Sequence, residues 1–387
     1  MTVPVNKQAV RFGIIGAGLM GRECASAAAR WMHLEDIGSR LEIAAVCDTD
    51  RTVLSWYERL RPRPALCGDY RELLGDASID AVYVAVPHHL HQEVMIATLL
   101  AGKNLLGEKP FGIDLAANRA INSVLAERPA SLVRISSEMP FYPGGQRLFH
   151  WMKERRFGEL IEMRTQFLHS SDLDPRKPIN WKRMARFNGR YGCMSDLGLH
   201  ALHLPLRLGV KVTNVRALLS DVIRQRPDKS GNMVPCDTWD NAVLVCDAEL
   251  EDNRFPFRVE MKRIAPGEAN TWAFEVDGTR GSIRYTTKYP KTLQWMDYSP
   301  GETQVWRTID LGSESAYRSI TGAIFEFGFS DAVLQMLTAY VDELVHGEQG
   351  MRQPFYCATP AEVARTHELF EAALASHDRQ VVVQLGD

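Results

Sequence analysis

Apolar positions in the first third of the chain form short continuous runs separated by helix-like stretches. The runs predicted as buried strands are 11–16, 41–47, 81–86, 104–107 and 131–136. The stretches predicted as helices are 19–31, 90–101 and 114–127. Continuous apolar strands that alternate with helices are typical of a parallel sheet covered on both faces. The first domain is therefore predicted to be an α/β domain.

The pattern changes after about residue 137, where longer runs alternate apolar and polar positions. The predicted strands here are 160–168, 241–245, 258–263 and 271–276, and helices are predicted over 331–346 and 360–377. Turn signals such as Asp277-Gly278 separate the strands. Alternation of this kind indicates a mostly antiparallel sheet. The sequence thus predicts two domains, 1–137 and 138–387, the second of them α+β.

Composition and charge exclude several classes of protein. The 387 residues carry 45 Lys and Arg against 48 Asp and Glu, a net charge of −3, which argues against a general binder of nucleic acid or anionic membranes. The seven cysteines are odd in number and show no C-x-x-C spacing, so we expect reduced thiols. Residues 1–10 do not resemble a leader and no apolar stretch reaches the ~18–20 residues of a membrane helix. We expect a cytoplasmic protein.

A glycine-rich turn follows the first predicted strand. Its sequence is Gly16-Ala17-Gly18-Leu19-Met20-Gly21, and an alanine-rich helix follows it. In this context G-x-G-x-x-G is typical of dinucleotide binding, because the glycines permit a tight turn and close approach of a pyrophosphate to the helix N-terminus. The alternative is a turn that only connects strand and helix. We predict cofactor contacts at Gly16, Gly18, Leu19, Met20 and Gly21.

Asp48 ends the second predicted strand, where a carboxylate can bind the ribose hydroxyls of NAD and repel the extra phosphate of NADP. It lies 48 − 21 = 27 residues after the last glycine, more than the usual ~20, and 33–40 resembles an insertion. Arg51 is close enough to compensate for a phosphate. NAD is therefore the predicted cofactor and NADP the less favoured alternative; Asp48 could also be a simple turn residue.

Two further strand ends carry candidate cofactor contacts. Pro87 breaks the third strand at its carboxyl end, where ligands bind in such sheets. The predicted contacts there and after the next strand are Val86, Pro87, His88, His91, Glu108 and Lys109. A metal site at His88, His89 and His91 is the weaker interpretation, because in a turning segment the three rings point in different directions. We predict no metal.

These motifs, in this order, resemble the glucose–fructose oxidoreductase / inositol dehydrogenase / rhizopine-catabolism (Gfo/Idh/MocA) family. The resemblance rests on the glycine motif, Pro87 with His91, and Glu108-Lys109-Pro110. Two later segments support it: 192–200 (GCMSDLGLH), similar to the family's G-x-x-x-D-x-G-x-H, and 278–282 (GTRGS), similar to its G-T-x-G-S hairpin. The resemblance implies a Rossmann domain, a second domain with an open-faced sheet, and a nicotinamide cofactor.

The resemblance also implies three catalytic residues. Lys109 matches the lysine that binds the reacting hydroxyl, and Asp196 and His200 match the acid–histidine pair that faces it. On a helix, a spacing of four places Asp196 and His200 on one face, where a carboxylate can orient a histidine base. The alternative is a capping aspartate and a buried structural histidine. A metal bound by this pair with His203 is possible in principle but has no visible fourth ligand.

Candidate substrate contacts lie in two segments. Residues 138–143 (EMPFYP) stand where many relatives carry R-F-x-P, so the substrate floor differs and Glu138 becomes a candidate. The segment 172–190 is rich in Arg and Lys, which can hold an anionic group, or else lie on a solvated surface. The predicted substrate contacts are Lys109, Glu138, Arg176, Lys177, Trp181, Arg183, Asp196 and His200.

Three functions remain open from sequence. The leading one is an NAD-dependent oxidoreductase that moves a hydride between nicotinamide and a secondary hydroxyl of a sugar, polyol or anionic sugar derivative. The second is a redox-neutral NAD-dependent glycosidase that acts on an anionic glycoside by oxidation, elimination, hydration and reduction. The third is a cofactor-bound sensor without turnover. The partner is a small carbohydrate, with no nucleic acid or membrane, and the resemblance implies pairing through apolar sheet faces into a homodimer or homotetramer.

Overall fold

The computed structural model describes residues 9–35, 37–312, 315–322 and 324–386, which form two compact units. The first unit contains Met1–Phe141 and Ser315–Pro360, and the second contains Tyr142–Glu314 and Ala361–Asp387. This grouping differs from the division predicted from sequence in two segments. The first boundary lies a few residues later, after Phe141, and residues 315–360 follow the second domain's strands along the chain but group with the first unit.

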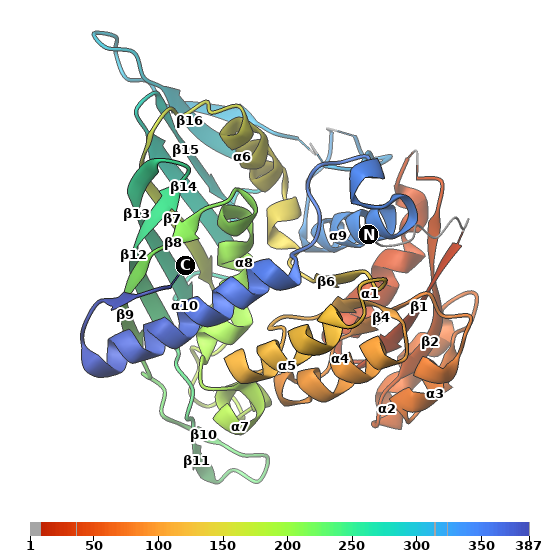
Figure 1. The fold of residues 1–387 in the computed structure, drawn as a ribbon. Coiled ribbons are helices and arrows are strands. Elements are labelled where there is room, and N and C mark those ends of the chain that lie inside the picture. The colour runs from red at the N-terminus through yellow and green to blue at the C-terminus, as the bar shows by residue number, and fades with distance from the viewer. Residues whose placement is uncertain (1–8, 36, 313–314, 323, 387) are drawn as a thin grey trace. The chain divides into compact units, whose positions relative to one another are not determined.

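The first unit contains a six-stranded parallel sheet in the order β3-β2-β1-β4-β5-β6 (Figure 1). Its strands are β1 (Ala9–Ile15), β2 (Arg40–Cys47), β3 (Ala65–Cys67), β4 (Ala81–Val84), β5 (Asn104–Gly107) and β6 (Val133–Ile135). This is the strand order of the dinucleotide-binding α/β fold, so the predicted fold of this part is confirmed. The three-residue strand β3 was not predicted, because it is too short to show a pattern.

Helices on the two faces of this sheet include one from late in the chain. The main helices are α1 (Leu19–Ala29), α4 (His91–Leu100), α5 (Leu115–Ala126) and α9 (Phe329–His346), and shorter ones are α2 (Arg51–Leu54) and α3 (Tyr70–Gly75). Helix α9 packs against α1. The ring of Tyr340 meets that of Phe12 at 5.7 Å, and Arg30 pairs with Asp331 at 2.6 Å. Helix α9 therefore completes the core of the first unit.

The insertion seen at 33–40 has a structural partner in the same unit. Leu34 forms a β-bridge with Ser319, and the Glu35 amide donates to the Arg318 carbonyl at 2.9 Å. The His33 Nε2 lies 2.7 Å from the Thr321 hydroxyl oxygen. The extra residues between Gly21 and Asp48 thus bind the segment that leads into α9.

The second unit contains a ten-stranded mixed sheet in the order β17-β16-β15-β14-β7-β13-β12-β9-β18, with β8 paired to β12. Its strands are β7 (Leu160–Leu168), β8 (Lys211–Val212), β9 (Asn214–Ser220), β12 (Asn241–Leu250), β13 (Asn253–Lys262), β14 (Thr271–Gly278), β15 (Gly281–Thr286), β16 (Thr292–Asp297), β17 (Arg307–Asp310) and β18 (Val383–Gln384), and β10 (Gln225–Pro227) pairs separately with β11 (Met233–Pro235). Only β7 and β13 run parallel. The predicted large, mostly antiparallel sheet is confirmed.

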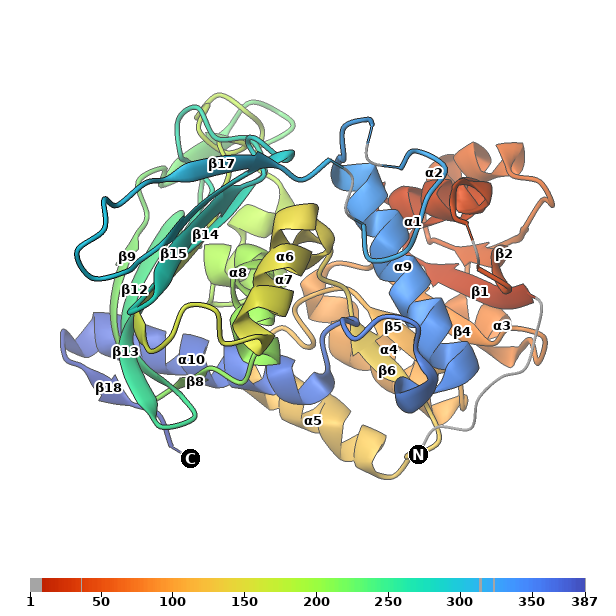
Figure 2. The same ribbon diagram turned by 90° about the horizontal axis from the view of Figure 1, so that it is seen from above.

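Helices cover one face of this sheet. Helix α6 (Pro143–Lys153) packs on β15, and α8 (Cys193–Arg207) packs on β7 and β13 (Figure 2). The remaining helices of the unit are α7 (Ala185–Asn188) and α10 (Pro360–Arg379). Within the described ranges, no helix combines the length and the apolar character that a membrane span requires.

The opposite face of the sheet combines ion pairs with exposed apolar residues. Arg164 of β7 pairs with Glu275 of β14 at 2.7 Å, and Glu162 of β7 pairs with Arg258 of β13 at 2.6 Å. Cross-strand ion pairs of this kind stabilise neighbouring strands. On β9 and β12 the same face carries exposed apolar side chains, namely Leu218 and Val245.

Helix α8 carries the sequence 192–200 and depends on two of its glycines. Gly192 has φ +58, and a Cβ there would lie 2.5 Å from the Trp239 amide nitrogen. A Cβ on Gly198 would lie 2.2 Å from Cζ of Phe370 on α10. The glycines of the signature are therefore explained by a tight turn before α8 and by close packing of α8 on α10.

We expect Gly198→Ala to destabilise the second unit. Alanine favours a helix by up to about 1 kcal/mol, but overpacking against the Phe370 ring costs about 1–3 kcal/mol, so thermal denaturation should show a lower Tm. Phe370→Leu in the same chain should restore part of the loss. Gly75→Ala is the control, since nothing lies within 4 Å of the added Cβ in helix α3. An unchanged Tm for Gly198→Ala would contradict the packing argument.

Candidate active site

The glycine loop after β1 has the geometry of a dinucleotide cradle. Gly16 has φ +102, and a Cβ there would lie 2.4 Å from the Ala85 carbonyl oxygen. A Cβ on Gly21 would lie 2.2 Å from the Gly16 carbonyl oxygen, whereas nothing lies within 4 Å of one on Gly18. The outer glycines thus serve the turn and helix packing, and the middle one borders open space.

The N-terminus of α1 is suited to an anion. Its N-cap Gly18 supplies no side-chain hydrogen bond, its first turn contains no acidic residue, and Leu19 is 73% exposed. The first amide groups of a helix have no partner within the helix, and a pyrophosphate can accept from them. The loop and helix together fit the cofactor that the glycine motif predicts.

Asp48 links the end of β2 to this loop. One of its carboxylate oxygens accepts from the Ala17 amide at 2.8 Å and the other from the Asp50 amide at 2.9 Å. The Gly16 amide donates to the Cys47 carbonyl at 2.9 Å. A carboxylate can accept about four hydrogen bonds, so Asp48 keeps acceptor capacity for ribose hydroxyls while it holds the loop.

His91 joins two strand ends instead of pointing to solvent. The ring is fully buried, with Nδ1 2.6 Å from the Pro110 carbonyl oxygen and Nε2 2.9 Å from that of Val86. Burial lowers the pKa of His91, which favours the neutral ring. His91 therefore acts through the backbone at Val86 and Pro110. His88 is also buried and its ring lies 5.3 Å from that of His91, whereas His89 is exposed.

Acidic side chains gather at the carboxyl ends of β5 and β6. The Glu108 carboxylate accepts from the hydroxyls of Tyr83 and Ser136, and Glu108 is only 6% exposed. Glu138 is also buried. Burial, and then the charge of Glu108, raise the pKa of Glu138 to about 7, while the positive charge of Lys109 acts in the opposite direction. Near neutral pH Glu138 is thus divided between its acid and carboxylate forms.

Asp196 and His200 occupy the first two turns of α8 and are both 3% exposed. The spacing of four places them on one helix face, as predicted. Two cations hold the Asp196 carboxylate: Lys182 Nζ lies 2.7 Å from Oδ1, and Arg263 Nη1 donates to Oδ2. The His200 ring packs edge-on against Phe167 at 4.9 Å between centroids.

Sequence reasoning missed the partners of Asp196. Arg263 lies 67 positions later and directly follows β13, so no local pattern links the two residues. Lys182 belongs to the basic segment but is not among the predicted substrate contacts. The one available signal was the density of positive charge just before α8.

Most predicted cations of the basic segment have partners in the same unit. Arg176 is exposed and pairs with Asp174 at 3.0 Å, and the Lys177 ammonium donates to the Ser171 carbonyl at 3.0 Å. Arg183 has no exposed surface and pairs with Asp240 at 2.5 Å. Arg183 therefore holds the segment in place, which corrects its predicted contact with substrate.

Across the described ranges, no group of three or more His, Cys, Asp or Glu side chains is arranged to hold a metal ion. His88, His89 and His91 do not converge, since two rings are buried and the third is exposed.

Comparison with known proteins identifies the family. The model described as "Oxidoreductase family, NAD-binding Rossmann fold" matches residues 10–133, and the GFO/IDH/MocA C-terminal domain matches 146–284. Together these matches cover more than half of the chain. The chain belongs to the GFO/IDH/MocA family. Its first unit is the NAD-binding Rossmann fold of that family.

Two curated relatives are named for sugar substrates. The chain is 27% identical over 261 residues to levoglucosan dehydrogenase of Pseudarthrobacter phenanthrenivorans, a match that covers 64% of this chain and 66% of that protein. It is 28% identical over 171 residues to an α-N-acetylgalactosaminidase of Shewanella oneidensis, covering 42% and 36%. The chain thus spans less than two thirds of the length of these curated relatives.

Solved structures share the fold over nearly the whole chain. A levoglucosan dehydrogenase in complex with NADH and levoglucosan has a TM-score of 0.86 and 22% identity, covering 98% of this chain and 100% of that one. At this identity the likeness establishes the fold.

We expect Asp48→Asn to weaken cofactor binding. The asparagine amide lacks the negative charge that accepts from the Ala17 amide and that would accept from a ribose hydroxyl. Loss of a hydrogen bond to a charged group lowers affinity about ten- to a hundredfold. The Kd for NADH, measured by fluorescence titration, should rise by that factor. Asp50→Asn is the control, because the exposed Asp50 caps the short helix α2 through Thr52. Equal NADH affinity in the wild type and Asp48→Asn would contradict the assignment.

We expect Glu138→Gln to change how stability depends on pH. The pKa of Glu138 is about 7 in the folded protein, above its ordinary value of 4.5, so the folded state holds a proton that the unfolded state has released. Between these two pKa values the wild type should lose about 1.4 kcal/mol per pH unit, and the variant should lack this slope.

Urea denaturation from about pH 5 to about pH 8 measures this slope. The advantage of Glu138→Gln over the wild type should grow as the pH rises to about 7 and then level off. Glu127→Gln is the control, since Glu127 is exposed in the same unit. Parallel stability curves for Glu138→Gln and the wild type would exclude a raised pKa.

Proposed function

We propose that the protein is an NAD-dependent oxidoreductase that removes a hydride from the carbon bearing a secondary hydroxyl of an uncharged sugar or polyol. The observation that carries this proposal is the buried Asp196–His200 pair on one face of α8, in a chain whose other unit is an NAD-binding Rossmann fold. Oxidation of an alcohol releases a proton together with the hydride, so it requires a positioned base.

His200 is the proposed base. Its pair with Phe167 and the hydrogen bond from Trp272 Nε1 to the His200 carbonyl, 2.9 Å long, fix this turn of α8. Asp196 lies one turn earlier on the same face of α8, where Lys182 and Arg263 hold its carboxylate in place. Lys109, through the family motif, binds the reacting hydroxyl and lowers the cost of its ionisation. When bound, the nicotinamide supplies the hydride acceptor.

An uncharged substrate agrees best with the charges around α8. Lys182 pairs with Asp196, Arg183 with Asp240 and Arg263 with Asp172. Cations neutralised in this way attract an anion weakly, because its charge would meet both members of each pair. The levoglucosan bound in the related dehydrogenase is such an uncharged sugar. We therefore favour uncharged sugars over the anionic ones considered from sequence.

A redox-neutral glycosidase is the second candidate. It is supported by the similarity to an α-N-acetylgalactosaminidase, which covers 42% of the chain. The same lysine, aspartate and histidine could serve both reactions, since each begins with removal of a hydride and a proton. In the glycosidase the hydride returns to the sugar, so NADH does not accumulate.

Three further properties belong to the proposal. NAD is preferred to NADP, since Asp48 ends β2 beside the glycine loop. The seven cysteines are free thiols, which suits a reducing compartment such as the cytoplasm. Subunits would pair into a homodimer or homotetramer through this sheet face, where ion pairs lie beside the exposed Leu218 and Val245.

The test is one assay of NADH formation and sugar products with NAD and a panel of uncharged sugars, polyols, sugar acids and glycosides. We expect NADH and a keto product, and His200→Asn should lower kcat by about 10²–10⁴-fold while NADH still binds. His150→Asn, on an exposed position of α6, is the control. Aglycone release without NADH would favour the glycosidase, and full turnover by His200→Asn would reject His200 as the base.

A further inference from the structure

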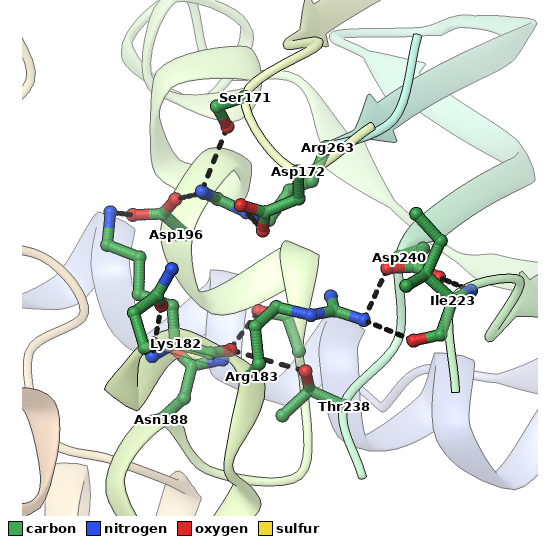
Figure 3. A network of polar contacts seen from close by, with 12 residues as sticks. Ser171, Asp172, Lys182, Arg183, Asn188, Asp196, Ile223, Thr238, Asp240 and Arg263 are labelled. Atoms are coloured by element: carbon green, nitrogen blue, oxygen red, sulfur yellow. Dashed lines mark hydrogen bonds and ion pairs between the residues drawn. The ribbon is translucent and has the colours of Figure 1, made fainter. Parts of the chain in front are cut away.

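Four charged side chains form a continuous row beside the first turn of α8 (Figure 3). Lys182 Nζ lies 2.7 Å from Asp196 Oδ1, and Arg263 bonds Asp196 Oδ2. The Nε of Arg263 donates to Asp172 Oδ2 at 2.7 Å, and its Nη2 donates to the Ser171 hydroxyl at 3.1 Å. Positive and negative charges therefore alternate from Lys182 to Asp172.

This alternation keeps Asp196 ionised. If Asp196 took up a proton, the charges of Lys182 and Arg263 would remain on either side of a neutral group in a buried environment, which is costly. Asp196 is thus poorly suited to accept the proton of an alcohol. Its charge instead holds the Lys182 ammonium in a fixed place near the face of α8 that carries His200.

The two ends of this row of charges differ in their exposure. Asp172 and Arg263, at one end, are 1% and 8% exposed and belong to the loops after β7 and β13. Lys182, at the other end, is 31% exposed. Lys182 is therefore the member of the four that a dissolved molecule can reach most easily.

The backbone around Lys182 is also fixed. The Asn180 side chain accepts from the Lys182 amide at 2.9 Å, and the Thr238 hydroxyl donates to the Lys182 carbonyl at 3.2 Å. The next residue, Arg183, is fully buried and pairs with Asp240 (Figure 3). A long lysine side chain is ordinarily free to move, but here both its backbone and its ammonium are held.

We infer that Lys182 is a substrate-positioning residue: its ammonium, held by Asp196, donates a hydrogen bond to a hydroxyl oxygen of the carbohydrate. The inference rests on the proposed function and deepens it. An ammonium carries three hydrogens, so Lys182 can bond Asp196 and still donate to a hydroxyl oxygen of a sugar or polyol.

The test compares Lys182→Met, Lys182→Arg and the control Lys229→Met in the full-length protein. Lys229 is an exposed lysine of the same unit and is not among the predicted substrate contacts. For each protein we would measure the Tm, the Kd for NADH, kcat and KM, and the affinity for levoglucosan, L-sorbose and myo-inositol in the presence of NADH.

We expect Lys182→Met to raise KM and the sugar Kd about ten- to a hundredfold, with a much smaller effect on kcat and none on NADH binding. Lys182→Arg should recover most of the affinity, because a guanidinium also donates to hydroxyls. Lys229→Met should match the wild type. A lower Tm for Lys182→Met with unchanged KM and sugar Kd would overturn the inference and leave a structural ion pair.

Failure of the proposed function would be seen separately. If the wild type binds a sugar but forms no NADH, the oxidoreductase proposal fails, and weaker sugar binding by Lys182→Met would still support the inference. If the wild type binds none of the three sugars, the inference is overturned as well.

Discussion

A buried carboxylate needs positive charge beside it, and the second unit is organised around that requirement at Asp196. The acid lies in the first turn of α8, and the cations that hold it come from the segment before α8 and from the end of β13. Each of these cations is in turn fixed by another acid or by a buried neighbour. An unpaired buried charge is costly, so the Asp196 carboxylate ties three elements together. They are the segment before α8, the end of β13 and α8 itself.

The first unit meets a different constraint, which acts on the backbone. The loop after β1 must turn sharply and still leave room for phosphates, and Gly16, Gly18 and Gly21 divide these tasks. Asp48 then holds the loop itself through the Ala17 amide, and His91 holds the backbone at Pro110, after the neighbouring strand β5. His91 therefore contributes to binding indirectly, through main-chain positions, whereas Asp48 both holds the loop and keeps acceptor capacity for ribose hydroxyls.

The sequence predicted those parts whose cause is local. The glycine loop, the two α8 residues and nine of the eighteen strands in the described residues were found because spacing along the chain determines their geometry, and β7 was predicted with its observed bounds. Arg263, the pairing of Arg183 with Asp240 and the place of 315–360 were not found. Each depends on contact between distant segments, which charge and periodicity within a short window do not specify. Charge density marked the segment 172–190 but could not show which cation would be buried.

The return of the chain to its first unit affects the order in which the protein can be completed. Helix α9, eighteen residues long and mostly buried, packs on α1 and covers Phe12 through Tyr340. During synthesis the six strands of the first sheet leave the ribosome long before α9 exists, and the strands β7 to β17 are made in between. The first unit therefore cannot complete its core, and leaves part of its apolar surface uncovered, until the second unit's strands and then α9 have been translated. The unit that begins the sequence is thus completed late in synthesis.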